Sequence, residues 1–267
     1  MGSKERAERL LAEGRPYDAM MDAGKDFDIG MRAYLALGGG VIRTRMADLE
    51  RAGNGTPEGY RSLAEEAVRG DEMGLRIDLV HELWTKSGGD PNAGLAAGGD
   101  FHVGRYRETG RMRYFETAMK YYGKAGARER SVALAREAVE RFRREGGAVF
   151  LSDALEGLQK EAKLSEQEIA REVPELQSWV PVDRLLQAKG PFSVDHVWRV
   201  EETAAYDAFL QKITGRTLDS FFKDVREKAP RGLFGRPKLP LFAKDTLRTW
   251  GTSVLRKAIQ DRYGKSA

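Results

Sequence analysis

Apolar residues recur at helical spacing along most of the chain, most regularly in residues 111–146. One stripe at the i, i+3, i+4, i+7 positions consists of Phe115, Ala118, Met119 and Tyr122. Gly126 is a natural helix stop, and a second stripe follows it. That stripe consists of Val132, Ala135, Ala138, Val139 and Phe142. Because neither stripe can stay exposed to water, the pattern predicts two helices that pack on each other and on further helices.

Capping signals mark where other helices begin. Thr56 precedes Pro57, an order typical of an N-cap followed by the first helical residue. Ser165 precedes Glu168 by three residues, which matches a capping box, in which the two side chains satisfy each other's free backbone N–H groups. These positions predict helix starts near residues 57 and 166.

Glycine clusters interrupt the helical pattern at two places. Three consecutive glycines at residues 38–40 predict a break, because each glycine in a helix interior costs about 1 kcal/mol relative to alanine. Residues 87–101 read SGGDPNAGLAAGGDF and predict a loop. Asp90 and Pro91 could start a single helical turn there, which Gly98 and the glycine after it would end.

No segment shows the alternation typical of a strand, so the pattern predicts an all-α protein with ten or more helices. Two architectures fit it, an irregular helical bundle and a short stack of antiparallel helical hairpins. Two glycines follow residue 145 and predict a domain boundary. We expect a helical-hairpin, repeat-like region in residues 1–146 and a C-terminal helical region with a basic end in residues 147–267.

The spacing Ala118-x3-Tyr122-x2-Ala125 resembles the small–aromatic–small pattern in the second helix of the tetratricopeptide (TPR) repeat. The segment at residues 14–19, GRPYDA, resembles the turn between the paired helices of that family. The resemblance covers about a third of the chain. It implies stacked hairpins with a groove that binds a peptide or another protein.

The amino-acid composition limits the classes of protein to which the chain can belong. Hydrophobic residues make up 41% and charged residues 32% of the 267 residues, values typical of a folded globular chain. No apolar run approaches the ~18 residues of a membrane-spanning helix, and the charged start of the sequence does not resemble a secretion signal. The chain has no cysteine, which excludes disulfides, thiolate zinc sites and cysteine nucleophiles. We therefore expect a cytoplasmic protein without a membrane span.

Charge is distributed unevenly along the chain. The formal net charge is +4, yet residues 211–267 contain 14 Lys and Arg against 5 Asp and Glu. The preceding residues are therefore net acidic. A basic C-terminal end on a mildly acidic body indicates an anionic partner for that end.

The basic segment at residues 228–265 is the strongest candidate contact surface in the sequence. Its cations could neutralise phosphates, and its phenylalanines could stack on bases. An acidic protein surface or anionic lipid headgroups would suit the same composition, and a solubilising surface with the phenylalanines in the core is a further interpretation. The candidate binding residues are Lys228, Arg231, Phe234, Arg236, Lys238, Lys244, Arg248, Arg256 and Lys257.

Catalytic signatures are weak. The histidines are His81, His102 and His196. Asp78 and His81 share a helix face and could bind a metal ion, but the second such pair of a two-metal bundle is not evident. Neither a G-x-S-x-G nor an H-E-x-x-H motif occurs. The sequence therefore predicts no cofactor and no metal site, and an enzyme would need a pocket where these histidines converge.

These features favour a non-catalytic protein-binding scaffold or adaptor with a basic C-terminal contact surface. A second interpretation is a protein that binds DNA or RNA through residues 228–265. A third is a helical enzyme with a dispersed active site. The sequence leaves the oligomeric state open.

Overall fold

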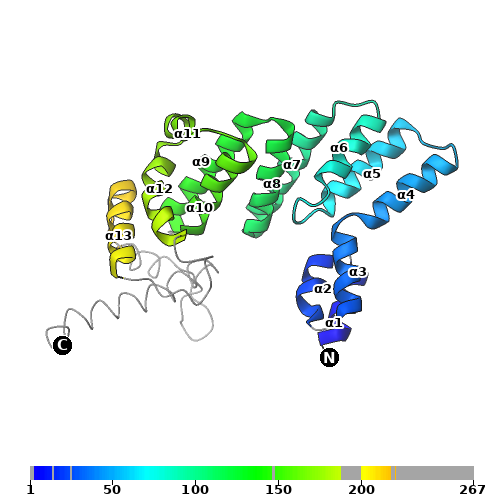
Figure 1. Cartoon of the computed structure of the whole chain (residues 1–267), viewed down its shortest axis with the longest axis horizontal. Coiled ribbons are helices and arrows are strands. Elements are labelled where there is room, and N and C mark those ends of the chain that lie inside the picture. The colour runs from blue at the N-terminus through cyan, green and yellow to red at the C-terminus, as the bar shows by residue number, and fades with distance from the viewer. Residues whose placement is uncertain are drawn as a thin grey trace. The chain divides into compact units, whose positions relative to one another are not determined.

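The protein is all-α, as predicted (Figure 1). The computed structural model describes residues 3–13, 15–24, 26–145, 148–187, 200–217 and 220. These residues form thirteen α-helices and one π-helical turn, and they contain no strand. None of the helices in this part of the chain is both long and apolar enough to cross a membrane.

Most of the described helices follow one another with short connections. In chain order they are α1 (Ser3–Ala12), α2 (Pro16–Ala23), α3 (Phe27–Leu37), α4 (Gly40–Arg51), α5 (Pro57–Arg69), α6 (Ile77–Lys86), α7 (Pro91–Thr109), α8 (Met112–Ala125), α9 (Arg128–Glu145), α10 (Ala148–Glu156), α11 (Glu166–Glu172), α12 (Pro174–Gln187) and α13 (Val200–Thr214). The π-helical turn at Gly157–Glu161 follows α10.

The chain forms two compact units. The first contains the described residues up to Leu134 together with Lys160–Lys163, and the second contains the other described residues from Ala135 onward. Helix α9 belongs partly to each unit. The domain boundary that the glycines after residue 145 predict remains a prediction.

Local signals in the sequence correctly predicted several helix ends. Thr56 accepts a hydrogen bond from the Gly59 backbone N–H (3.1 Å) at the start of α5. The break at residues 38–40 separates α3 from α4, and Gly39 there has a φ of +79°, a left-handed conformation that favours glycine. Gly126 ends α8 in the same left-handed region. Both apolar stripes of residues 111–146 are buried.

The loop predicted at residues 87–101 is wrong, because α7 runs as one helix through most of this segment. Asp90 caps the helix by accepting the Asn92 backbone N–H (2.9 Å), and Pro91 takes the first position. The helix passes through Gly98 without a break and ends only at Gly110, which has a φ of +69°.

The glycines of α7 allow aromatic rings to pack directly on its backbone. A Cβ atom on Gly94 would lie 2.4 Å from the Trp84 ring, and one on Gly99 would lie 2.3 Å from the Tyr122 ring. Real Cβ atoms do not approach other atoms so closely, so these positions require glycine. The principal partner of α7 is α8, which carries Tyr122. Helix–helix packing therefore compensates for the poor helix propensity of this segment.

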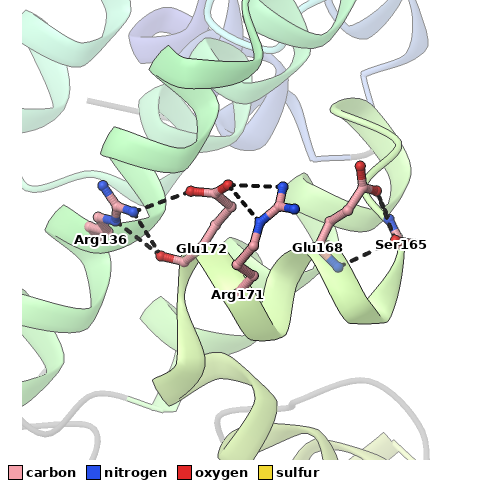
Figure 2. Close-up of polar contacts among 5 residues, drawn as sticks. All are labelled: Arg136, Ser165, Glu168, Arg171 and Glu172. Atoms are coloured by element: carbon pink, nitrogen blue, oxygen red, sulfur yellow. Dashed lines mark hydrogen bonds and ion pairs between the residues drawn. The ribbon is translucent and has the colours of Figure 1, made fainter.

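In the second unit, α12 packs against α10, α11 and α13. The predicted capping box is present at the start of α11, where Ser165 and Glu168 satisfy each other's backbone N–H groups (Figure 2). At the other end of α11, Arg136 of α9 donates to the Glu172 carbonyl oxygen from Nε (3.1 Å) and Nη2 (2.9 Å) (Figure 2). This guanidinium satisfies a carbonyl that the helix end leaves without an intrahelical partner.

Candidate functional site

Exposed apolar side chains are concentrated in one short part of the chain. Among the described residues, eight large apolar side chains are exposed, and six of them belong to residues 21–41. Single exposed apolar residues are normal on a protein surface, but a local group of them marks an interaction surface. The six are Met21, Phe27, Met31, Tyr34, Leu35 and Val41.

Helix α3 carries the core of this group, which we call the α3 apolar stripe: Phe27, Met31, Tyr34 and Leu35. The four residues lie at i, i+4, i+7 and i+8, so they share one helix face. Their exposed fractions are 78%, 41%, 59% and 57%. The opposite face of the helix packs into the protein, and its residues are Ile29, Ala33 and Leu37. The stripe is thus an apolar surface that no other part of the described chain covers.

The start of α3 is fixed by a capped N-terminus. Asp26 accepts a hydrogen bond from the Ile29 backbone N–H (3.2 Å). Its carboxylate also pairs with Lys4 Nζ of α1 (3.0 Å), and the hydrogen bond from Lys4 lowers the pKa of Asp26. A negative charge at a helix N-terminus interacts favourably with the helix dipole. The first turn of the stripe is therefore capped by Asp26, which also contacts α1.

The end of α3 is held by a buried arginine. Arg76 donates from Nη2 to the Ala36 carbonyl oxygen (2.6 Å) and from Nε to the Leu37 carbonyl oxygen (2.9 Å). These carbonyls belong to the last turn of α3, where backbone acceptors lack intrahelical partners and a cation is favoured. Burial lowers the pKa of Arg76, yet a guanidinium stays protonated in proteins.

Asp71 is buried, and its negative charge interacts favourably with the buried Arg76. Its carboxylate accepts the backbone N–H groups of Leu75 (2.9 Å) and Arg76 (3.0 Å) and the Tyr121 hydroxyl (3.0 Å). Burial raises the pKa of Tyr121, so its hydroxyl remains a donor. Gly70 leaves room for the guanidinium, since a Cβ there would lie 2.3 Å from Arg76 Nη1. The network ties the end of α3 to α5, α6 and α8.

Charges flank the stripe on one edge and are locally balanced. Arg32 donates to both carboxylate oxygens of Glu8 of α1 (2.8 and 3.1 Å) and lies 3.9 Å from an oxygen of Asp28. Because acidic and basic groups alternate there, the surface is not suited to a polyanion such as nucleic acid. It is suited to an apolar protein surface with a polar rim.

The candidate residues of the basic segment lie outside the described part of the chain. Their use as a contact surface therefore stays a prediction. The residues concerned are Lys228, Arg231, Phe234, Arg236, Lys238, Lys244, Arg248, Arg256 and Lys257.

The histidines that an active site would need do not form a group in the described residues. His102 is fully buried, its ring packs against those of Phe101, Tyr114 and Tyr121, and neither ring nitrogen has a hydrogen-bond partner in this part of the chain. Burial, with a smaller contribution from Arg105, lowers its pKa to about 4, so it is neutral at pH 7. His196 lies outside the described residues. Among the residues described, no His, Asp and Glu side chains group as a metal site would require.

Comparison with known proteins gives no relative from which a function could be transferred. No protein-family model, curated protein or solved structure matches this chain.

Proposed function

We propose that this chain is a protein-binding helical scaffold and that the α3 apolar stripe is its contact surface. The observation that carries the proposal is the exposure of Phe27, Met31, Tyr34 and Leu35 on one face of a helix that is capped at its start and held by a buried arginine at its end. Aromatic residues and methionine are enriched at the centres of protein interfaces. A rigid helix also loses little conformational entropy when a partner binds.

The α3 stripe adds a specific surface to the scaffold function that the sequence favoured. The resemblance to TPR repeats implied a groove between stacked hairpins, and that groove remains a prediction. The stripe instead lies on the outer face of one helix near the N-terminus. A partner that docks on it would present an apolar face of its own, because burial of apolar area supplies most of the association free energy.

A double variant of the stripe tests this proposal. We expect Phe27→Gln/Leu35→Gln to lower recovery of specific partner proteins by at least about tenfold, because it removes two apolar anchors. The measurement is quantitative mass spectrometry of proteins that co-purify with the tagged full-length chain, after nuclease treatment of every sample.

Leu75→Gln is the matched control, since Leu75 is a similarly exposed leucine outside α3. It should recover the same proteins as the wild type. Equal recovery with the wild type and the double variant would contradict the proposal, provided that both fold, as circular dichroism would show.

The charge of the C-terminal end supports a second candidate, a protein that binds DNA or RNA. Residues 211–267 carry 14 Lys and Arg against 5 Asp and Glu. We expect the triple variant Arg231→Gln/Arg236→Gln/Lys238→Gln to weaken nucleic-acid binding and to reduce its salt dependence, because each phosphate contact releases counterions. Fluorescence anisotropy between about 50 and 200 mM salt measures both effects. Binding that does not respond to salt, or no binding to any tested DNA or RNA, would eliminate this candidate.

A further inference from the structure

The α3 apolar stripe has a property that points to its partner. Phe27 and Leu35 lie four residues on either side of Met31, so the stripe is nearly symmetric along the helix. If two α3 helices pack antiparallel around a two-fold axis at Met31, Phe27 of each copy lies opposite Leu35 of the other. Met31 then meets Met31, and each of these apolar side chains contacts an apolar partner. Such self-complementarity is what a two-fold interface requires.

Gly30 leaves room on the helix surface for a side chain of the second copy. A Cβ atom on Gly30 would have nothing within 4 Å, so packing within the described chain does not require a glycine there. Gly30 and Tyr34 lie on one edge of the stripe. With a rise of about 1.5 Å per residue, the two-fold axis brings Tyr34 of one copy within about 3 Å, along the helix, of Gly30 of the other. The ring can therefore pack on bare helix backbone.

The same packing of a ring on a helical glycine occurs inside the first unit. The rings of Trp84 and Tyr122 contact α7 at Gly94 and Gly99, where a Cβ atom would not fit. Gly30 is a site of this kind on which none of the described residues places a ring. Gly30 lies about 1 Å to 2 Å from the two-fold axis along the helix. The space above its backbone would be filled only in the paired state, by the Tyr34 ring of the second copy.

The opposite edge of the stripe is complementary in charge. It carries Asp28 and Arg32, one helical turn apart. The two-fold axis places Asp28 of one copy about 3 Å, along the helix, from Arg32 of the other, while the two Asp28 residues are about 9 Å apart. Glu8 neutralises Arg32 within each copy. The same axis brings the two Arg32 residues to about 3 Å from each other along the helix, and their pairing with Glu8 and Asp28 reduces the repulsion between them.

The area of the stripe indicates the class of interface that it can form. At roughly 200 Å² for each large side chain, the exposed fractions correspond to about 470 Å² per copy. Two stripes together bury about 900 Å², less than the ~1,200 Å² at the lower limit of stable interfaces. The pair is therefore expected to dissociate in the micromolar range.

We propose that the partner of the α3 apolar stripe is a second copy of this chain, bound as a weak antiparallel two-fold dimer centred on Met31. This inference rests on the proposed function, because it names the partner of the same surface. A heterologous protein on the stripe is the competing outcome.

Sedimentation velocity of the full-length chain between about 1 and 100 µM tests the dimer. We expect the wild type to pass from monomer to dimer over this range, and Phe27→Gln/Leu35→Gln to raise the dissociation constant at least about tenfold. Gly30→Ala distinguishes an effect on the stability of the fold from an effect on dimerisation. It should raise the melting temperature, because alanine favours helix, and yet weaken the dimer, because its methyl group occupies the site of the Tyr34 ring.

Cross-linking tests the position of the axis. The chain has no cysteine, so Met31→Cys introduces a single thiol at the proposed axis. A short bismaleimide that spans the ~8–10 Å between paired helices should cross-link this variant into a dimer, but not the Leu75→Cys control. A monomer at all concentrations, or a dimer that persists in Gly30→Ala and the double variant, would overturn the inference. If the monomer still binds another protein through the stripe, the proposed function stands without the dimer.

Discussion

Replacing Arg76 by alanine is expected to lower the free energy of unfolding by about 3–5 kcal/mol, because it leaves buried polar groups without their partner. The variant removes the guanidinium donors from the Ala36 and Leu37 carbonyls, of which the first keeps the Gly39 N–H. It also leaves the buried carboxylate of Asp71 without the positive charge of Arg76. Arg76→Lys should not restore stability, since one ammonium cannot reach two carbonyls as the planar guanidinium does. Urea unfolding followed by circular dichroism measures the change.

The exposed ion pair between Arg45 and Glu66 provides the matched control. Arg45→Ala should cost no more than about 1 kcal/mol, because half-exposed ion pairs contribute little to stability. Equal losses for the two alanine variants would show that Arg76 does not anchor α3. The stripe would then lie on a helix end that is free to fray.

Two glycines in the same helix should respond to alanine with opposite signs. Gly99→Ala is expected to destabilise the protein by about 2 kcal/mol, because its Cβ would lie 2.3 Å from a Tyr122 ring that is buried and held by Asp100. Gly104→Ala, with nothing within 4 Å of the added Cβ, should stabilise it by up to about 1 kcal/mol. Thermal unfolding of the two variants and the wild type measures both changes.

The pair of variants controls for helix propensity, since both make the same replacement in α7. If Gly99→Ala were as stabilising as Gly104→Ala, the close contact between α7 and Tyr122 would be refuted. The glycines of this segment would then have no role in packing.

Signals that depend only on neighbouring residues correctly predicted much of the fold. The N-cap of α5 at Thr56, the capping box of α11 at Ser165 and the helix stop at Gly126 all depend on residues within one turn of the helix end. The stripes of residues 111–146 were also correctly assigned to the core, because their spacing defines a single apolar face.

Helix α7 could not be predicted from local propensity, because its stability comes from partners that are distant in the sequence. Its glycines are poor helix formers until the rings of Trp84, Tyr121 and Tyr122 pack on them. The sequence did contain one pattern from which α7 could have been predicted. Gly94, Gly98 and His102 recur at i, i+4 and i+8, which places them on one helix face, and all three are buried. Glycines four residues apart on one helix face indicate close packing rather than a loop.

The α3 stripe was missed for a different reason. Met31, Tyr34 and Leu35 have the spacing of a core face, but Ile29, Ala33 and Leu37 form a second apolar face on the same helix. The sequence cannot tell which face is covered, because Arg76, which fixes the end of α3, is 39 residues from Leu37 along the chain. The structure resolves this ambiguity by burying the face with the smaller side chains.

Photo-cross-linking from α3 shows whether another protein contacts the α3 apolar stripe. A photoreactive phenylalanine analogue in place of Tyr34 samples the stripe in the full-length chain, and the same analogue in place of Leu75 samples an exposed apolar position elsewhere. If the stripe is a protein-binding surface, irradiation in a native extract yields a defined protein adduct at residue 34 and none at residue 75. An absence of any protein adduct at residue 34, with α3 folded, would contradict the claim.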